Sequence, residues 1–369
     1  SNVIDLDRFC EAICTKKMFS RRKSSNSRKA SMSRELMLSC LSAVKKSVCR
    51  SLCATLAGDS AAYCANRIDK LFEHAVIGGK CVRGRLLVAA YNALDRHATR
   101  ERIQQVATVG ACLEILQAFF LIFDDVMDRS TTRRGKPCWH TLPDVGLNAV
   151  NDGLLLDSVI NEVLNDVLEN DPNKDTVSSI FLRAKQMTVI GQMLDNSTSG
   201  LKDCTWERYG DIVTHKTSYY TCFAPLRVAM LLADRFMYTD ETERIAFKLG
   251  YLFQAQDDYL DCFGDPLVTG KVGSDLREGK CTWVTCKAAE RLRHQPQYTA
   301  MFEENFGRRS DESEMTLKKL LGELRVGEEF GRFEAEYSRI LLDDIEYFKL
   351  VDLRSVLRLA LSELFNRRK

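Results

Sequence analysis

The chain has 369 residues, of which 45% are hydrophobic and 28% are charged. These values are close to those of ordinary globular proteins, so they exclude a collagen-like chain, a wholly disordered chain and a membrane bundle. No run approaches the ~18 consecutive apolar residues that a membrane-spanning helix requires, so we expect no transmembrane segment.

The first predicted element is a basic, serine-rich arm at residues 1–34. Eight cations between Lys16 and Arg34 alternate with serines, and no acidic residue falls among them. Such a segment has too little apolar surface to pack into a core, so we expect it to be disordered. Arg- and Ser-rich N-termini without acidic residues are also typical of organelle transit peptides. The predicted location is therefore the cytoplasm, or the mitochondrion if the arm is a transit peptide.

Charge and cysteine spacing exclude two further classes of protein. The formal net charge is +2, and without the eight cations of the arm the rest of the chain is mildly acidic. Affinity for a phosphate backbone requires clustered cations on the folded surface, so no nucleic-acid partner is expected. The 14 cysteines lack the close Cys-x-x-Cys and His spacings of a zinc site, so we expect reduced thiols packed in the interior.

From about residue 35 to the end of the chain, apolar residues recur at helical spacing. One stripe runs from Val106 to Phe120 and another from Tyr337 to Phe348. Such stripes indicate amphipathic helices, whereas alternating strand-like runs are scarce. The chain has only 6 prolines, the strongest helix breakers, and the first is Pro137. We predict a single all-α domain over residues 35–369, a large bundle of about ten or more helices.

Two copies of the pattern DDxxD end strongly apolar stretches of this body, at residues 124–128 and 257–261. In each copy the first and last aspartates lie four residues apart and share a helix face, where they repel each other unless a cation lies between them. Oxygen ligands without His or Cys are those that Mg²⁺ prefers, and this ion commonly binds one or two carboxylates together with substrate phosphates. A single acidic cluster is usually a solvated helix face, but two copies favour a site for metal ions and a phosphorylated substrate.

Cations accompany both clusters, as diphosphate binding would require. Arg133 and Arg134 follow the first cluster, and Lys271 and Lys280 follow the second. A glycine turn at residues 78–83 presents two further cations one helical turn apart, which suits a second anion. Each basic segment alone would be ordinary surface, but their order along the chain favours diphosphate chemistry.

These motifs, in this order, resemble those of the trans-prenyltransferases, and within them the farnesyl diphosphate synthases. The resemblance covers roughly residues 35–369. The motifs that carry it are GGKxxR at 78–83, LQAFFLxxDDxMD at 116–128, TRRGKPCW at 132–139, GQxLD at 191–195, KTxxY at 216–220, FQxQDDYLDCFGDP at 253–266 and GKxGxDxxxGKCTW at 270–283.

The resemblance implies a central catalytic cavity between two aspartate-rich walls. It implies an enzyme that adds isopentenyl diphosphate to dimethylallyl diphosphate and then to geranyl diphosphate, and releases farnesyl diphosphate and diphosphate. About three Mg²⁺ ions per site would be required, with Mn²⁺ as an alternative. The carboxylates implied as metal ligands or their supports are Asp124, Asp125, Asp128, Asp257, Asp258 and Asp261.

The same resemblance implies the roles of the remaining site residues. Thr217 and Gln254 would place oxygens near the developing carbocation, and they are expected to act in catalysis together with Lys216, Asp124 and Asp257. The residues implied to bind the allylic diphosphate are Arg133, Lys216, Lys271, Lys280, Gln192 and Asp195. The residues implied to bind isopentenyl diphosphate are Lys80, Arg83, Gln117, Arg134 and Arg367.

Product length is expected to depend on the aromatic residues that precede the first aspartate. Phe120 lies one helical turn before Asp124, with Phe119 beside it, so the pair would cap the space into which the isoprenoid tail grows. Phe123 occupies a position that is commonly smaller in the family, and it predicts a reshaped pocket near the first aspartate.

Other functions fit part of this pattern. A geranyl diphosphate synthase would stop after one condensation. A terpene synthase on the same fold would ionise a single diphosphate and would not need Lys80, Arg83 and Arg134. A non-catalytic partner subunit would be expected to have lost a carboxylate or Lys216, and all are present. The resemblance also implies a homodimer, the commonest soluble assembly.

Overall fold

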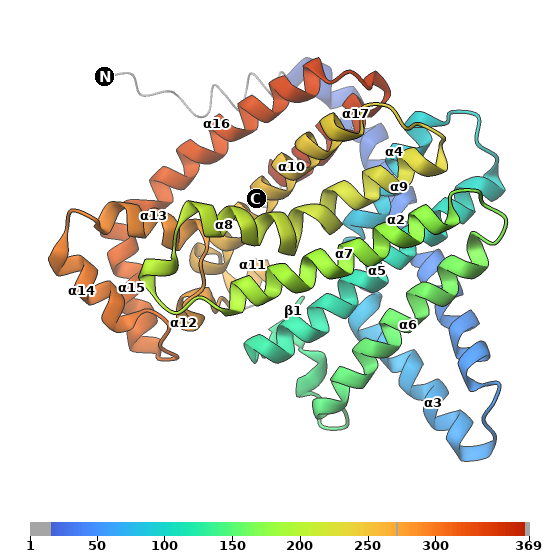
Figure 1. Ribbon diagram of the computed structural model, residues 1–369, viewed down its shortest axis with the longest axis horizontal. Helices are drawn as coiled ribbons and strands as arrows, with labels where there is room; N and C mark the ends of the chain where they lie inside the picture. Colours follow the sequence, from blue (N-terminus) through green and yellow to red (C-terminus); the bar gives the residue numbers. More distant parts are fainter. Residues whose placement is uncertain (1–15, 271, 366–369) are drawn as a thin grey trace.

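The structure is a computed structural model that describes residues 16–270 and 272–365, with side chains described for 33–266, 268–270 and 272–365. Almost all of this chain is helical, so the predicted all-α class is confirmed (Figure 1). The helical elements of the first half are α2 (Lys16–Cys53), α3 (Gly58–Leu71), η1 (Phe72–Val76), α4 (Val82–Leu94), α5 (Arg100–Asp128), η2 (Trp139–Thr141), η3 (Gly146–Asn148), α6 (Ala149–Val167) and α7 (Lys174–Asn196).

The second half continues the bundle without a linker. Its helical elements are η4 (Leu201–Asp203), α8 (Trp206–Ile212), η5 (Val213–Phe223), α9 (Ala224–Leu232), α10 (Thr239–Phe263), α11 (Pro266–Thr269), α12 (Asp275–Glu278), α13 (Trp283–Leu292), α14 (Pro296–Asn305), α15 (Asp311–Glu323), α16 (Val326–Tyr347) and α17 (Val351–Phe365). Elements η1 and η5 are π-helices, and the other η elements are 3₁₀ turns. The strands in the described residues are β1 (Thr132–Arg133) and β2 (Lys136–Pro137), an antiparallel pair in which Thr132 faces Pro137.

Helix α2 crosses the boundary that the sequence predicted at residue 35. The backbone of residues 16–34 continues this helix, whereas the sequence favoured disorder for the whole arm. Residues 16–53 contain neither Gly nor Pro, so nothing in their composition interrupts a helix that the buried residues Met37 and Leu41 anchor to the core. Residues 1–15 lie outside the described residues. The division into arm and body stays a prediction.

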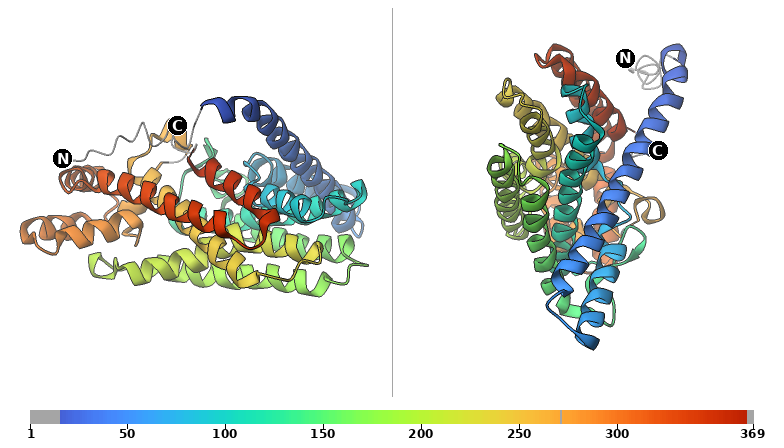
Figure 2. Two further views of the ribbon diagram at one scale, coloured as in Figure 1. Left: turned by 90° about the horizontal axis from the view of Figure 1, so that it is seen from above. Right: turned by 90° about the vertical axis from the view of Figure 1, so that its right-hand side faces the viewer.

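Helix α5 is the central helix of the bundle. Thr99 caps its N-terminus, where the Thr99 hydroxyl accepts the N–H of Arg102 at 3.2 Å, and Arg129, with a left-handed φ of 54°, follows its last residue. Figure 2 shows α5 between α2 on one side and α6 and α7 on the other. By length and composition α5 could cross a membrane, but 72% of its most apolar window is buried inside the protein. A helix that is apolar all round and enclosed by others is a core helix.

Helices α10 and α7 enclose the π-helix η5. A Cβ atom on Gly191 of α7 would lie 2.2 Å from the backbone nitrogen of Lys216, and one on Gly250 of α10 would lie 2.4 Å from Oγ of Ser218. The two glycines therefore allow both neighbouring helices to approach the backbone of η5 closely. Because η5 carries Lys216 and Thr217, this close packing fixes where these side chains enter the interior.

The core consists of two clusters. The larger is built mainly from α2, α4, α5, α6, α7, α9 and α17, and the smaller from α8 and α13–α16, with Trp283, Phe302 and Phe330 among its largest buried side chains. A cavity of about 2660 Å³ receives side chains from both halves of the bundle, including the C-terminal ends of α5 and α10. Each of these helices ends in one of the two DDxxD motifs.

Candidate active site

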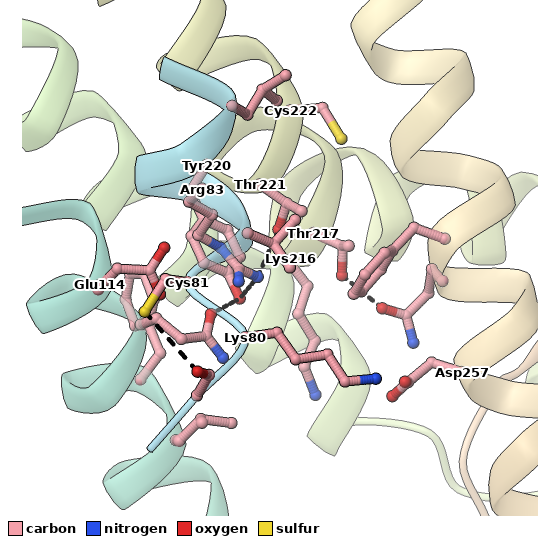
Figure 3. Close-up of a pocket in the computed structure, with 18 of the residues that line it drawn as sticks. Lys80, Cys81, Arg83, Glu114, Lys216, Thr217, Tyr220, Thr221, Cys222 and Asp257 are labelled. Carbon is pink, nitrogen blue, oxygen red and sulfur yellow. Dashed lines mark hydrogen bonds between the residues drawn. The ribbon is translucent and has the colours of Figure 1, made fainter. Parts of the chain in front are cut away.

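The two aspartate motifs face one cavity, as the sequence predicted. Asp124 and Asp128 line it from the last turn of α5, and Asp257 and Asp261 line it from α10. Figure 3 shows Asp257 on one side of the cavity and the segment that carries Lys80 on the opposite side. Lys216 and Thr217, on η5, lie at the back of the cavity between them. Residues separated by more than a hundred positions in sequence are therefore gathered at one site.

Cations lie between the carboxylates of the first motif. Lys216 Nζ donates to Asp195 Oδ2 at 2.6 Å and to Asp124 Oδ1 at 3.2 Å. Lys280 Nζ donates to Asp128 Oδ2 and lies 3.5 Å from Asp195 Oδ2. Asp195, on α7, thus joins the two lysines. The repulsion predicted between Asp124 and Asp128 is therefore compensated.

Arg133 completes this group from the hairpin that follows α5. Its guanidinium donates to Asp125 Oδ1 at 2.9 Å through Nε and at 2.5 Å through Nη2, and to Asp124 Oδ2 at 3.2 Å through Nη2. Four carboxylates, those of Asp124, Asp125, Asp128 and Asp195, therefore meet three cations. We call these seven side chains the cation–carboxylate cluster.

Burial and charge together set the protonation states of this cluster. Burial alone would raise the pKa of Asp124, but Lys216, Lys280 and Arg133 outweigh it and hold the pKa well below its usual range. Burial would likewise lower the pKa of Lys216, but Asp124 and Asp195 raise it above its usual range. For Asp128 the balance is the reverse, because burial and the Asp124 charge raise its pKa despite Lys280. The cluster keeps its lysines and Asp124 charged near neutral pH.

The second motif is held mainly by backbone and amide groups. Asp258 accepts the N–H of Trp283 at 2.9 Å and the amide of Gln254 at 2.7 Å, and Asp261 Oδ1 accepts the N–H groups of Ser274 and Asp275, both at 3.0 Å. Burial raises the pKa of Asp258 to about 7, although these hydrogen bonds oppose the shift. These contacts fit the supporting roles expected of Asp258 and Asp261.

Thr217 and Gln254 form the pair that the sequence predicted near the reacting carbon. Thr217 Oγ1 donates to Gln254 Oε1 at 2.5 Å, and the Gln254 amide donates in turn to Asp258. Both residues line the cavity, and Thr217 is buried. The orientation of these dipoles is therefore fixed before any ligand arrives.

A second group of cations lies across the cavity at the start of α4. Arg83 is buried, and its Nη2 donates to Tyr220 Oη at 2.9 Å and to Thr221 Oγ1 at 2.8 Å. Tyr220 Oη donates to Gln117 Oε1 at 2.7 Å, and the Arg83 guanidinium lies 4.4 Å from the centre of the Tyr220 ring. Lys80 is exposed and extends toward Asp257 in Figure 3. This group, with Gln117 and Arg83 at its base, lines the same cavity as the two aspartate motifs.

Glycine and glutamate shape the backbone of this second group. Glu114 of α5 is buried, and its Oε1 accepts the N–H of Gly84 at 2.8 Å in the first turn of α4. Cys81, which precedes α4, has a left-handed φ of 50°. Arg134 lies against Gly79, where a Cβ atom would be 2.9 Å from its Nη2. These contacts fix the turn that presents Lys80 and Arg83.

Aromatic rings close the cavity behind the first aspartate motif. The ring centres of Phe119 and Phe120 are 5.1 Å apart, those of Phe119 and Phe123 are 5.0 Å apart, and Phe120 meets Tyr220 edge to face at 5.1 Å. All four residues line the cavity. The predicted position of Phe119 and Phe120 beneath Asp124 is thus consistent with the structure.

The sequence did not point to some residues of the site, and two residues that it predicted there are not described by the structure. Tyr220 and Thr221 contact Arg83 but were not predicted as site residues. Tyr220 is the last residue of the KTxxY motif, so the motif could have indicated it. Glu278 was also missed, although its carboxylate lies 3.5 Å from Lys280 Nζ. Gln192 lines the cavity, but its amide donates to Asn196 at 3.3 Å. Lys271 and Arg367 lie outside the described residues.

The residues present fit divalent metal ions held jointly with a ligand. Among the described residues, no three His, Cys, Asp or Glu side chains converge closely enough to hold an ion by themselves. Asp124, Asp128 and Asp257 nevertheless present carboxylate oxygens, the ligands preferred by Mg²⁺, to one cavity. Every cysteine among the described residues is free, and most are buried, as the sequence predicted.

Comparisons with known proteins agree with this geometry. The family model described as polyprenyl synthetase matches residues 65–324. The farnesyl pyrophosphate synthase of Rattus norvegicus is 39% identical over 284 residues, which are 74% of this chain and 80% of the relative, and that of Zea mays is 38% identical over 311 residues, 82% and 88% of the two chains. The solved structure of T. brucei farnesyl diphosphate synthase complexed with risedronate has a TM-score of 0.84 at 27% identity and covers 91% of this chain and all of its own.

Proposed function

The chain belongs to the polyprenyl synthetase family, and on that premise we propose that it is a Mg²⁺-dependent farnesyl diphosphate synthase. It adds isopentenyl diphosphate first to dimethylallyl diphosphate and then to geranyl diphosphate, and it releases one diphosphate at each step. The observation that carries this proposal is the presence of two separate groups of cations on one cavity, each of which can hold a diphosphate. One is the cation–carboxylate cluster, and the other is the group around Lys80 and Arg83.

The allylic diphosphate binds at the cation–carboxylate cluster. Asp124, Asp128 and Asp257 would hold about three Mg²⁺ ions, or Mn²⁺ in their place, which supply Lewis-acid neutralisation of the departing diphosphate. Lys216, Lys280 and Arg133 contact the same diphosphate from fixed positions, and Asp125 and Asp195 orient these cations. Lys271 and Gln192 complete the proposed set.

Ionisation leaves an allylic cation that must be protected from water. The hydroxyl of Thr217 and the amide of Gln254 lie at the cavity wall in a fixed orientation, so their oxygens stabilise this cation without reorganisation. The rings of Phe119, Phe120 and Phe123 line the same cavity and exclude water from the tail.

Isopentenyl diphosphate binds at the second anion site. Its diphosphate contacts Lys80, Arg83, Arg134 and Arg367, with Gln117 beside them. Arg83 lines the cavity, and its hydrogen bonds to Tyr220 and Thr221 both come from Nη2. The double bond of isopentenyl diphosphate attacks the allylic cation, and a proton then leaves the new carbon chain.

The second anion site distinguishes this function from its alternatives. A terpene synthase consumes one diphosphate substrate, so it would not need the buried Arg83 of the second group of cations. A geranyl diphosphate synthase would have the same two sites but a shorter tail pocket. We propose that Phe119 and Phe120 set the length limit at fifteen carbons, because they lie behind Asp124 in the direction of the growing chain.

An assay with isotope-labelled isopentenyl diphosphate tests the proposal. The full chain with Mg²⁺ receives either dimethylallyl or geranyl diphosphate, and the products are separated by chromatography. We expect farnesyl diphosphate from both acceptors. Products of ten carbons alone would establish a geranyl diphosphate synthase. Hydrocarbon formed without incorporation of the label would establish a terpene synthase.

We further propose that the protein is a homodimer. The neighbouring helices α6 and α7 carry exposed apolar residues: Val150, Leu154, Leu182, Val189, Ile190 and Met193, of which Leu154, Val189 and Met193 also line the cavity. Exposed apolar surface is typical of a protein interface. Sedimentation at micromolar concentration should give the mass of a dimer, and replacement of Leu182 and Ile190 by Glu should give a monomer.

The cytoplasm is the proposed location, with the mitochondrion as the alternative. The basic composition of residues 1–34 supports the alternative. A fluorescent protein fused behind residues 1–34 distinguishes the two, because only a transit peptide would direct it into mitochondria.

A further inference from the structure

Gly153 of α6 lies directly against the ring of Phe123 on α5. A Cβ atom on Gly153 would lie 2.3 Å from Cε2 of Phe123, 3.0 Å from Cδ2 and 3.2 Å from Cζ. The three atoms nearest to that position all belong to one ring. The space that a side chain would occupy at Gly153 is therefore filled by Phe123.

The same ring also forms part of the cavity wall. Phe123 directly precedes Asp124, and it lines the cavity together with Phe119 and Phe120. The rings of Phe119 and Phe123 are inclined at 56° with centres 5.0 Å apart, so the three aromatic residues form one continuous wall. The position of Phe123 relative to α6 consequently affects how much space remains beneath Asp124.

The backbones of α5 and α6 are both held in place at this point. Asp152, the neighbour of Gly153, is buried. It accepts hydrogen bonds from Nη2 of Arg67 at 2.6 Å and from Nε1 of Trp139 at 2.8 Å. On the other helix, Asp124 and Asp125 are held by Arg133. A side chain at position 153 would therefore displace the flexible ring of Phe123 rather than either backbone, and the open direction for that ring is the cavity.

We propose that Gly153 is a specificity-determining residue, because its missing side chain seats the Phe123 ring away from the cavity and so preserves room for the longer allylic chain. The inference rests on the proposed condensation activity. A larger residue at position 153 moves the ring beneath Asp124 and stops elongation earlier. Gly153 and Phe123 act as one unit, although they come from different helices.

The experiment compares Gly153→Ala with Gly331→Ala. Gly331 lies in α16, and a Cβ atom there would meet nothing within 4 Å, so it is a matched control for the helical glycine. Each variant is supplied with labelled isopentenyl diphosphate and dimethylallyl diphosphate, and the ratio of ten- to fifteen-carbon product is measured. We expect Gly153→Ala to raise this ratio on the order of tenfold, the usual effect of one methylene group in an apolar pocket. Gly331→Ala should match the wild type.

Two further variants separate this mechanism from general loss of packing. Phe123→Leu should shift the products toward longer chains, since it removes the ring. Adding Gly153→Ala to Phe123→Leu should leave that distribution unchanged, because the displaced ring is absent. The inference is overturned if folded Gly153→Ala keeps the wild-type ratio, or if it shifts the ratio equally in the Phe123→Leu background. If Gly153→Ala does not fold, the inference is overturned instead by a Phe123→Leu variant whose products have the wild-type chain lengths. A wild-type chain that forms no condensation product contradicts the proposed function itself.

Discussion

The two DDxxD motifs have the same letters but different surroundings. In the first motif, Asp124, Asp125 and Asp128 all contact cations, which come from η5, the hairpin and the segment before α13. In the second motif, Asp258 and Asp261 accept backbone N–H groups and an amide. The first motif is therefore held by charge, whereas Asp258 and Asp261 of the second accept hydrogen bonds from neutral groups.

The difference shows how one pattern can serve two purposes. The cations of the first motif are the same side chains that we assign to the allylic diphosphate, so their partners must change when substrate and metal ions bind. The backbone donors of the second motif, the N–H groups of Ser274, Asp275 and Trp283, are not assigned to substrate. We expect the first motif to rearrange its contacts during turnover, while the second keeps Asp258 and Asp261 in place as a support for Asp257.

Removal of metal ions should have the largest effect on activity and little effect on the fold. With a chelator, condensation should stop, and added Mg²⁺ should restore it, because carboxylates alone cannot neutralise a departing diphosphate. The melting temperature should hardly change, since Lys216, Lys280 and Arg133 already compensate the first motif. Product chromatography and thermal melts of the same samples measure both. Full turnover in chelator would refute the metal assignment.

Loss of one carboxylate from each motif should test whether both motifs serve the reaction. Asp124→Asn and Asp257→Asn should each lower kcat by about a thousandfold or more, since a metal contact is worth several kcal/mol in the transition state. Asp124→Asn should also lower the melting temperature, because it removes a partner of the half-buried Lys216. Steady-state kinetics with thermal melts test the pair. Wild-type turnover in either variant would make that aspartate ordinary surface.

The pH dependence of stability should reveal the second motif. Because the pKa of Asp258 is raised to about 7, the folded protein keeps a proton that the unfolded chain releases above about pH 4. The free energy of unfolding contributed by Asp258 therefore falls as pH rises from about 4 to 7. Asp258→Asn cannot titrate, so its stability should fall less over this range. Denaturant unfolding in chelator measures the difference, and identical slopes in the two proteins would contradict the assignment.

The aromatic residues one turn before each motif should give the smallest effect on rate. Phe120→Ala opens space beneath Asp124, and burial of a longer tail there is favourable at ~25 cal/mol per Å², so products of twenty carbons or more should form. Phe253→Ala is the matched change before Asp257 and should keep the fifteen-carbon product. Both residues line the cavity. Chromatography of the products tests the pair, and a wild-type distribution for Phe120→Ala would place the length limit elsewhere.

Helix content and the ligand types were predictable from the sequence, because both depend on local patterns. Apolar periodicity and the rarity of proline predict helices, and carboxylates at i and i+4 share a face in any helix. The resemblance carried by the motif order then predicted Lys216 and Lys280 as diphosphate ligands. Their contacts with Asp195 could not be predicted in this way, since they depend on how α7, η5 and the segment before α13 pack together.

Other features depend on packing that leaves no local signal. Nothing in the residues around Gly153 indicates that the ring of Phe123 fills its empty side-chain position. From the sequence alone, Asp124 and Asp128 are expected to repel each other. The cations that compensate them, Lys216 and Lys280, lie 92 and 152 positions away in the chain. The helical backbone of residues 16–34 likewise could not be predicted from its own composition, because it continues a helix that Met37 and Leu41 anchor to the core.

The π-helical geometry of η5 has a consequence for how this protein can evolve. In η5 each turn holds more residues than an α-turn, and this register places Lys216 at the first anion site while Tyr220 and Thr221 contact Arg83 at the second. If the same residues formed an ordinary α-helix, at about 100° per residue, Thr221 would lie about 140° from Lys216 around the helix axis. The two side chains could then not face the same cavity. A change that converts η5 into an α-helix is therefore excluded by function, even where the helix itself would tolerate it.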